Sequence, residues 1–267
     1  MTVRLKPGAL RSWRNAKRRS YNSAYMRFLP GLQVFFIEVY KRSTLQSEPS
    51  GAGWKVLLAL LVLLGTSGCG TTFRVHPTVL FVGDSITHEW VQSYNGQQAT
   101  FAANNWLDVG VLGFTSSQIV GEFNEYIPAL KPQVVHVIAG TNDVYPGWQL
   151  SDTSTNIEIM VKKAKANHIS VVLGTIPPWG PEAIAEQADP SPQRFQRIAQ
   201  LNQWIMQFAA QQGVTVVDYH AVLAAANGEN YGAGLTFDGI HPSPTGYALM
   251  TAPAEQALKA VLAAPPP

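Results

Sequence analysis

Cysteine and long apolar runs are scarce in this sequence. A single cysteine, Cys69, stands among 267 residues, so no intramolecular disulfide can be proposed. The apolar run Val56–Leu64 has nine residues, whereas a helix that crosses a bilayer needs about 20. No two histidines have the His-Glu-x-x-His spacing of a zinc site, and no Gly-x-Ser-x-Gly segment occurs. The sequence therefore predicts neither a disulfide scaffold nor a histidine zinc motif.

Basic residues are scarce after residue 68. Residues 1–68 hold 11 of the 19 Lys and Arg and 2 of the 17 Asp and Glu, a net charge of +9 (11 − 2). Residues 69–267 hold the other 8 basic and 15 acidic side chains, a net charge of −7 (8 − 15). An acidic domain has no electrostatic reason to bind phosphate polymers. We therefore expect no nucleic-acid partner.

The boundary between these two parts has the pattern of an export signal. Lys55 precedes the apolar run Val56–Leu64, and the small residues Gly65–Gly68 and then Cys69 follow it. A short apolar core behind a positive charge and ahead of small residues is typical of a signal peptide. Segment 51–68 resembles a bacterial lipoprotein signal, in which the cysteine becomes the lipidated first residue of the mature protein. The alternative is an ordinary signal peptide with a coincidental cysteine.

Residues 1–50 form a basic extension that fits neither part. The charged region of a signal normally adjoins its apolar core, so we expect this extension to be non-native or disordered. Residues 69–267 are then one domain of 199 residues (267 − 68), which is enough for a substantial core. Gly70 after the cysteine does not indicate retention at the inner membrane. We expect an outer-membrane lipoprotein that faces the periplasm or the cell exterior and meets the membrane through its lipid anchor.

Apolar strand-like runs alternate with helical patterns in the acidic part. The predicted strands are Val79–Gly83, Trp106–Val111, Gln133–Ala139, Ser170–Thr175 and Val214–Val217. Apolar residues with a 3.6 period predict helices over Ser116–Leu130, from Asp152 or Thr153 onward, before Gly213, and around Tyr247–Leu262. This alternation indicates βαβ units and a parallel sheet covered on both faces. We expect a three-layer, flavodoxin-like α/β fold whose five-stranded parallel sheet has the order 2-1-3-4-5.

Polar segments follow the first three of these strands, and a fourth lies near the C-terminus. They are Gly83–Thr87, the glycine-rich stretch that ends at Gly113, Gly140–Asp143 and Asp238–His241. Because the carboxyl ends of parallel strands meet at one edge of a sheet, the first three are expected to lie together there, where α/β proteins bind ligands. The sequence therefore predicts a site at this edge.

Each segment supplies one need of nucleophilic catalysis. Ser85 has a hydroxyl that becomes nucleophilic once a base takes its proton, and His241 is a side chain that can do so near neutral pH. Asp238, three residues earlier, can orient that histidine. The backbone N–H groups of Ser85 and Gly113 and the side-chain amide of Asn142 can form an oxyanion hole.

These four segments, in this order, resemble the four blocks of the SGNH hydrolase superfamily, also called GDSL esterases and lipases. The resemblance runs from Val79 to about Tyr247. It implies a flavodoxin-like sheet, no metal or other cofactor, and hydrolysis of a small-molecule, glycan or lipid ester through an acyl-enzyme. It also implies that Ser85, Asp238 and His241 are catalytic. Asp108 departs from the family, in which many members have asparagine.

The sequence leaves the substrate open. A short acyl group on a carbohydrate and a lysophospholipid are both compatible with the motifs, and a catalytically silent binding module on the same fold is the second class of function. Asp84 and Asp143 are interpreted as loop-shaping residues, and His136 as a core histidine. Tyr145, Trp148 and Trp179 follow the third and fourth strands, where aromatic residues either bind substrate or pack.

Overall fold

Five parallel strands form one sheet in the order β2-β1-β3-β4-β5. The computed structural model describes residues 76–145, 147–180 and 193–267, so the predictions for residues 1–75, Cys69 included, lie outside the described residues. The strands are β1 (Val79–Gly83), β2 (Trp106–Asp108), β3 (Val134–Ile138), β4 (Ser170–Gly174) and β5 (Thr215–Val217). Every neighbouring pair is parallel. The predicted α/β class and strand order are confirmed.

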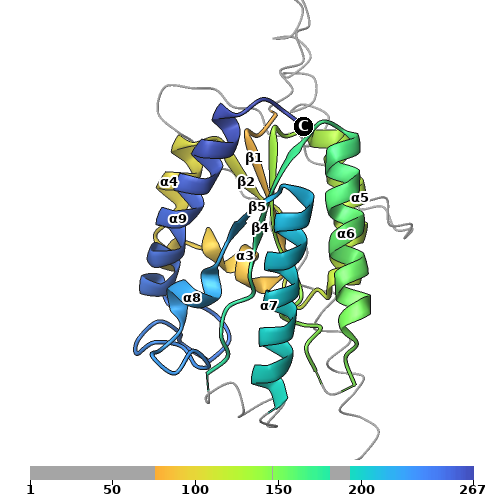
Figure 1. Cartoon of the computed structure of the whole chain (residues 1–267). Helices are drawn as coiled ribbons and strands as arrows, with labels where there is room; N and C mark the ends of the chain where they lie inside the picture. Colours follow the sequence, from red (N-terminus) through yellow and green to blue (C-terminus); the bar gives the residue numbers. More distant parts are fainter. Residues whose placement is uncertain (1–75, 146, 181–192) are drawn as a thin grey trace, which may run out of the picture. The chain divides into compact units, whose positions relative to one another are not determined.

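The central strands are buried because helices cover both faces of the sheet. All five residues of β1 and all five of β3 are buried, which matches their continuous apolar sequences. Figure 1 shows α9 (Pro244–Ala263) and α4 (Gln98–Ala103) on one side of the strands and α5 (Ser116–Leu130) and α6 (Leu150–Ala166) on the other. The remaining helices are α3 (Ser85–Trp90), η1 (Ser93–Asn95), α7 (Gln193–Gln212) and α8 (Tyr219–Leu223).

His136 is a core residue of β3, as predicted. Its side chain is fully buried, its ring lies 4.5 Å from the ring of Phe81, and its Nε2 lies 2.8 Å from the hydroxyl of Tyr219. Burial lowers its pKa to about 3. The imidazole is therefore neutral at physiological pH and belongs to the core.

Element ends differ from the predictions where side chains have other partners. Helix α6 begins at Leu150, before the predicted cap at Asp152 or Thr153. The Thr153 hydroxyl instead accepts a bond from the Trp148 indole and donates to Asp143. Strand β2 ends at Asp108, whose Oδ1 accepts the Gly110 N–H at 2.8 Å and turns the chain. Among the described residues, no helix is long and apolar enough to span a membrane.

Candidate active site

Ser85 stands at the junction of β1 and α3. The carboxylate of Asp84 caps α3 by accepting the Ile86 N–H at 2.9 Å, and Ser85 is the first residue of the helix. A Cβ at Gly83 would lie 2.1 Å from the Thr87 hydroxyl and 2.6 Å from the Ile138 carbonyl, so only glycine fits this turn. The sharp turn therefore presents Ser85 at the carboxyl edge of the sheet.

A chain of hydrogen bonds joins Ser85 to the two C-terminal candidates. Nε2 of His241 lies 2.8 Å from the Ser85 Oγ, and Nδ1 of His241 lies 2.5 Å from Oδ2 of Asp238. Oδ1 of Asp238 also accepts the backbone N–H groups of Ile240 and His241, at 2.9 and 2.7 Å. The structure thus brings together three residues that are up to 156 positions apart in sequence.

The electrostatics of this chain suit a proton relay. Burial lowers the pKa of His241, but the hydrogen bond and charge of Asp238 outweigh burial and leave that pKa above the ordinary 6.5. Burial raises the pKa of Asp238, but hydrogen bonds from His241 lower it by more. The pKa of Asp238 is therefore below the ordinary 3.8. Asp238 is therefore ionised at neutral pH and stabilises the protonated imidazole.

The predicted oxyanion donors lie on the neighbouring loops. Val111 donates its N–H to the Gly83 carbonyl at 3.0 Å, which ties the loop of Gly113 to the end of β1. The Asn142 amide donates to the carbonyl of Phe114 at 3.0 Å, next to Gly113. Ser85 is the first residue of α3, so its N–H has no acceptor within the helix. One of the two Asn142 N–H groups therefore joins the loops, a role that the sequence did not predict.

Asp143 connects the two helices that follow these loops. It accepts the N–H of Ser116 at 2.9 Å, the hydroxyl of Ser116 at 2.5 Å and the hydroxyl of Thr153 at 3.0 Å. Ser116 begins α5 and Thr153 lies in the first turn of α6. The interpretation of Asp143 as a loop-shaping residue agrees with these contacts.

Two carboxyl groups near Ser85 have strongly raised pKa values. They belong to Asp84, which directly precedes Ser85, and Asp108, at the end of β2. Asp84 is fully buried, and burial raises its pKa to about 6. Burial raises the pKa of Asp108 to about 8, so this side chain is mostly neutral at pH 7. A neutral carboxylic acid resembles the asparagine amide in shape. This similarity gives a physical reason why aspartate can stand at position 108.

Residues that support the His241 loop carried no signal in the sequence. The Thr236 hydroxyl donates to the His241 carbonyl at 2.8 Å and accepts the Gly239 N–H, while the Tyr231 hydroxyl donates to the Ile240 carbonyl at 2.7 Å. The ring of Phe237 stacks on the imidazole of His241. Such contacts follow from the folded path of the loop, which no local motif encodes.

Trp179 and Tyr145, interpreted as either substrate-binding or packing residues, contact each other. Their rings meet edge to face at 5.8 Å, and Trp179 is only 1% exposed. Trp179 is thus a packing residue in this structure. Among the residues that the structure describes, no group of three or more His, Cys, Asp or Glu side chains could hold a metal ion.

The sequence matches a known protein family. Residues 81–249 match the model of the GDSL-like lipase/acylhydrolase family. No curated protein matches the sequence.

Solved structures share the fold across most of the described chain. A protein of Bacteroides fragilis proposed to be an acylhydrolase is 29% identical, with a TM-score of 0.64, covering 79% of this chain and all (100%) of its own. A GDSL-like lipase of Bacteroides thetaiotaomicron is 28% identical, with a TM-score of 0.63 and coverages of 78% and 98%. An acetylxylan esterase of Geobacillus stearothermophilus is 21% identical, with a TM-score of 0.54 and coverages of 70% and 96%, a likeness that shows the fold alone.

Proposed function

We propose, for a chain that belongs to the GDSL-like lipase/acylhydrolase family, that Ser85 is the nucleophile of ester hydrolysis. Family membership makes the chain a carboxylic ester hydrolase, and the assignment of individual residues is our proposal. The observation that carries it is the continuous hydrogen-bonded chain from Ser85 through His241 to Asp238. This arrangement is the one that a Ser-His-Asp mechanism needs.

In the first half of the reaction, Ser85 Oγ attacks the carbonyl carbon while Nε2 of His241 takes the hydroxyl proton. The tetrahedral intermediate places its negative charge near the N–H groups of Ser85 and Gly113 and the amide of Asn142. His241 then gives its proton to the leaving alkoxide, the carbon–oxygen bond breaks, and an acyl-serine ester remains.

Water completes the cycle. His241 removes a proton from a water molecule, whose oxygen attacks the acyl carbon. The second tetrahedral intermediate expels Ser85, which regains its proton from His241, and the carboxylic acid leaves. Asp238 stays ionised throughout and holds the imidazole in the tautomer that presents Nε2 to Ser85. A catalytically silent binding module is not favoured, because the proposed nucleophile, base and orienting carboxylate are all present and bonded.

We propose an ester of a short acyl group as the substrate. Side chains of His241 and Asp238 are 23% and 41% exposed, whereas Ser85 is 6% exposed, so the site opens to solvent on the side of His241. An open site can reach an acyl group carried by a large alcohol such as a carbohydrate. The acetylxylan esterase that shares the fold acts on such an ester. A lysophospholipid is the second candidate, because its single ester could also reach an open site.

The direct test compares wild type with Ser85→Ala on acetyl, butyryl and longer-chain aryl esters. We expect Ser85→Ala to lower kcat/KM by at least about 10⁴-fold on every ester, because the nucleophile is lost. Ser93→Ala, at an exposed serine of η1, is the matched control and should keep wild-type rates. Equal hydrolysis by Ser85→Ala and wild type would refute the mechanism. The absence of hydrolysis with every ester in wild type would support the binding module.

Export and anchoring are a separate proposal that rests on the sequence around Cys69. We propose that this cysteine is lipidated and holds the domain at the outer membrane. Cys69→Ala in the full-length precursor is expected to move the protein from the membrane fraction to the soluble fraction. Unchanged membrane association of this variant would contradict lipid anchoring.

A further inference from the structure

An exposed aromatic ring lies beside the proposed catalytic base. Phe237 is 56% exposed, although burying a phenylalanine side chain is worth roughly 2–3 kcal/mol. Single exposed apolar residues are common on protein surfaces and need no function by themselves. Phe237 differs from such residues because its ring stacks on His241, the proposed catalytic base.

The contact between Phe237 and His241 is a stack. Their ring centroids are 5.9 Å apart and their planes differ by 16°. The loop holds this arrangement because the Phe237 N–H donates to the His241 carbonyl and the neighbouring Thr236 pairs with Pro242 in an antiparallel bridge. The exposed position of the ring is therefore set by the backbone of the catalytic loop.

The position of the base defines what Phe237 can touch. Nε2 of His241 must come within about 3 Å of the leaving oxygen to protonate it, so the alcohol part of the ester lies next to the imidazole. The Phe237 ring, whose centroid is 5.9 Å from that of the imidazole, is therefore a neighbour of the alcohol part in the proposed mechanism. The oxyanion donor Gly113 is on another loop, where the exposed apolar neighbour is Leu112, which is 53% exposed.

We propose that Phe237 is a specificity-determining residue whose exposed ring binds a pyranose ring in the alcohol part of the substrate. A flat aromatic ring offers a wide apolar surface, and a pyranose presents a similarly flat face of C–H groups. A flexible chain, such as the glycerol part of a lysophospholipid, matches a flat ring less well. This inference rests on the proposed function. It specifies the alcohol that is released when Ser85 attacks the ester.

The test measures kcat/KM for two acetyl esters, a monoacetylated methyl pyranoside and ethyl acetate, in wild type and Phe237 variants. For Phe237→Ala we expect the ratio of the pyranoside value to the ethyl acetate value to fall about 10-fold, as loss of an aromatic contact predicts. Phe237→Leu, which is apolar but not flat, should lower the ratio similarly, and Phe237→Trp should preserve it.

Two controls separate this proposal from a structural role of the ring. Tyr94→Ala removes an aromatic side chain that is 58% exposed on η1 and should leave the ratio unchanged. If Phe237→Ala lowers kcat/KM equally for both esters and shifts the acid limb of the pH profile, the ring only positions His241, and the proposal is overturned. A larger loss on a lysophospholipid than on the pyranoside would also overturn it.

Failure of the proposed function gives a different result. If Ser85→Ala hydrolyses the pyranoside ester as fast as wild type, the mechanism itself is wrong. If Ser85→Ala is inactive and Phe237→Ala leaves the ratio unchanged, only the assignment of Phe237 is wrong.

Discussion

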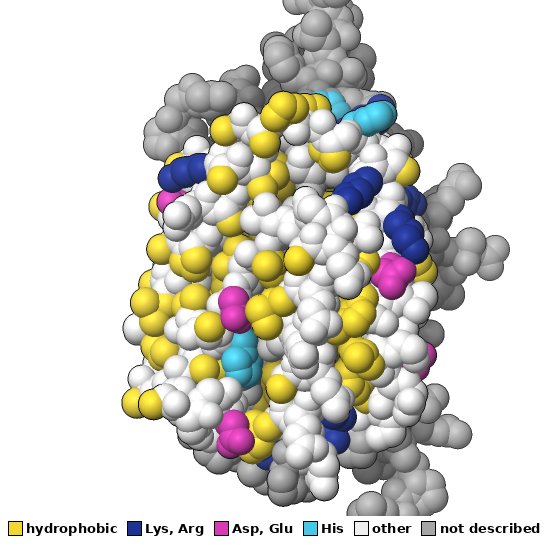
Figure 2. Space-filling view, viewed as in Figure 1, with side chains coloured by type: hydrophobic (Ala, Val, Ile, Leu, Met, Phe, Trp, Pro, Cys, Tyr) yellow, Lys and Arg dark blue, Asp and Glu magenta, His cyan; other side chains and the backbone are white. Residues whose placement is uncertain are grey.

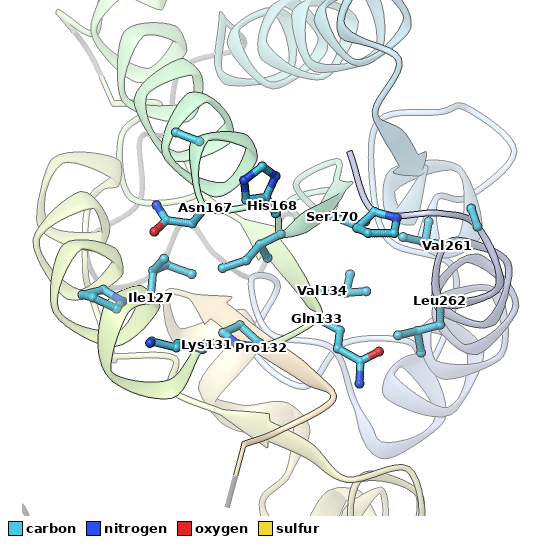
Figure 3. Close-up of a pocket in the computed structure, with 15 residues that line it drawn as sticks. Ile127, Lys131, Pro132, Gln133, Val134, Asn167, His168, Ser170, Val261 and Leu262 are labelled. Carbon is cyan, nitrogen blue, oxygen red and sulfur yellow. The ribbon is translucent and has the colours of Figure 1, made fainter. Parts of the chain in front are cut away.

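At the amino edge of the sheet, a cavity of about 610 Å³ lies where α5, α6 and α9 end, whereas Ser85, His241 and Asp238 lie at the carboxyl edge. Figure 3 shows the side chains around this cavity, which come from α5, the starts of β3 and β4, and α9. None of the three proposed catalytic residues lines it. The proposed chemistry therefore lies away from this cavity, at residues that are joined by hydrogen bonds and have shifted pKa values.

The two edges also differ in charge. The lysines of the described chain lie in the C-terminal halves of α6 and α9 and just after α5, at Lys131, Lys162, Lys163, Lys165 and Lys259. In Figure 2 the basic side chains gather mainly toward the upper end, where these helices end in Figure 1. Cations near helix C-termini offset the helix dipole. The basic edge thus has a structural explanation, and at the carboxyl edge Asp84 likewise caps the N-terminus of α3.

The largest expected difference is in kcat/KM, between substitutions of two histidines, one at each edge of the sheet. His241→Asn should lower kcat/KM by about 10⁴-fold, because the base is lost. His168→Asn, at the amino-edge cavity, should change kcat/KM by less than about 2-fold, since asparagine tolerates the left-handed backbone (φ 57°) of this position. Ester hydrolysis by both purified variants checks this. Similar losses in the two variants would break the distinction between the edges.

Two asparagines give the next largest contrast. Asn142→Ala should lower kcat by about 10²–10³-fold, because one oxyanion donor is lost. Asn167→Ala, which alters the wall of the cavity, should keep wild-type kcat. Steady-state kinetics give the comparison, and thermal unfolding of both variants controls for the lost bond between Asn142 and Phe114. A fall in kcat that tracks only a lower Tm would argue against an oxyanion role.

Asp108 lies at the carboxyl edge, at the end of β2. The substitution Asp108→Asn should stabilise the folded protein by an amount that depends on pH. Asp108 has a folded pKa of about 8 against 3.8 in the unfolded chain, so its contribution to stability declines as pH rises from about 4 to 8. Asparagine does not titrate. The variant should therefore gain unfolding free energy at pH 8, on the order of 5 kcal/mol for a pKa that rises from 3.8 to about 8, and the gain should vanish near pH 4. Urea unfolding at both pH values measures this, and a gain independent of pH would contradict a protonated Asp108 side chain in the folded protein.

The smallest effect concerns the titration of His241. Asp238 raises the pKa of this imidazole, so in wild type its NMR titration should have a midpoint above 6.5. In Asp238→Asn the burial that lowers the pKa remains and the charge that raises it is gone, so the midpoint should move to lower pH. An unchanged midpoint would show that Asp238 does not act on His241 through this bond.

The sequence predicted the sheet well because its strands are short, continuous apolar runs. It predicted α5 with the bounds observed, Ser116–Leu130, because apolar residues recur there with the period of a helix and Ile119, Phe123 and Ile127 are buried. The short elements between β1 and β2 were missed. In α4 only Phe101 is buried, and the other apolar residues are alanines, so the sequence has no clear apolar period there.

The candidate site residues could be selected from the sequence, whereas the contacts that hold them in place could not. Each candidate lay in a local motif with a known chemical use, so Ser85, Asn142 and His241 could be selected from the sequence alone. Phe237 carried no such motif, and its stack on His241 depends on how residues 236–242 fold back on themselves. The bond from Asn142 to Phe114 likewise links positions 28 residues apart. Contacts of this kind arise from tertiary packing alone.

The most direct measurement of the central claim is covalent labelling of the nucleophile. The protein is inactivated with an aryl phosphonate, in which serine Oγ attacks phosphorus and displaces the aryl oxide, and the modified peptide is then identified by mass spectrometry. We expect one adduct, on Ser85, formed in step with the loss of esterase activity and much more slowly in His241→Asn. An inactivated protein that carries its adduct elsewhere, with Ser85 unmodified, would show that Ser85 is not the nucleophile.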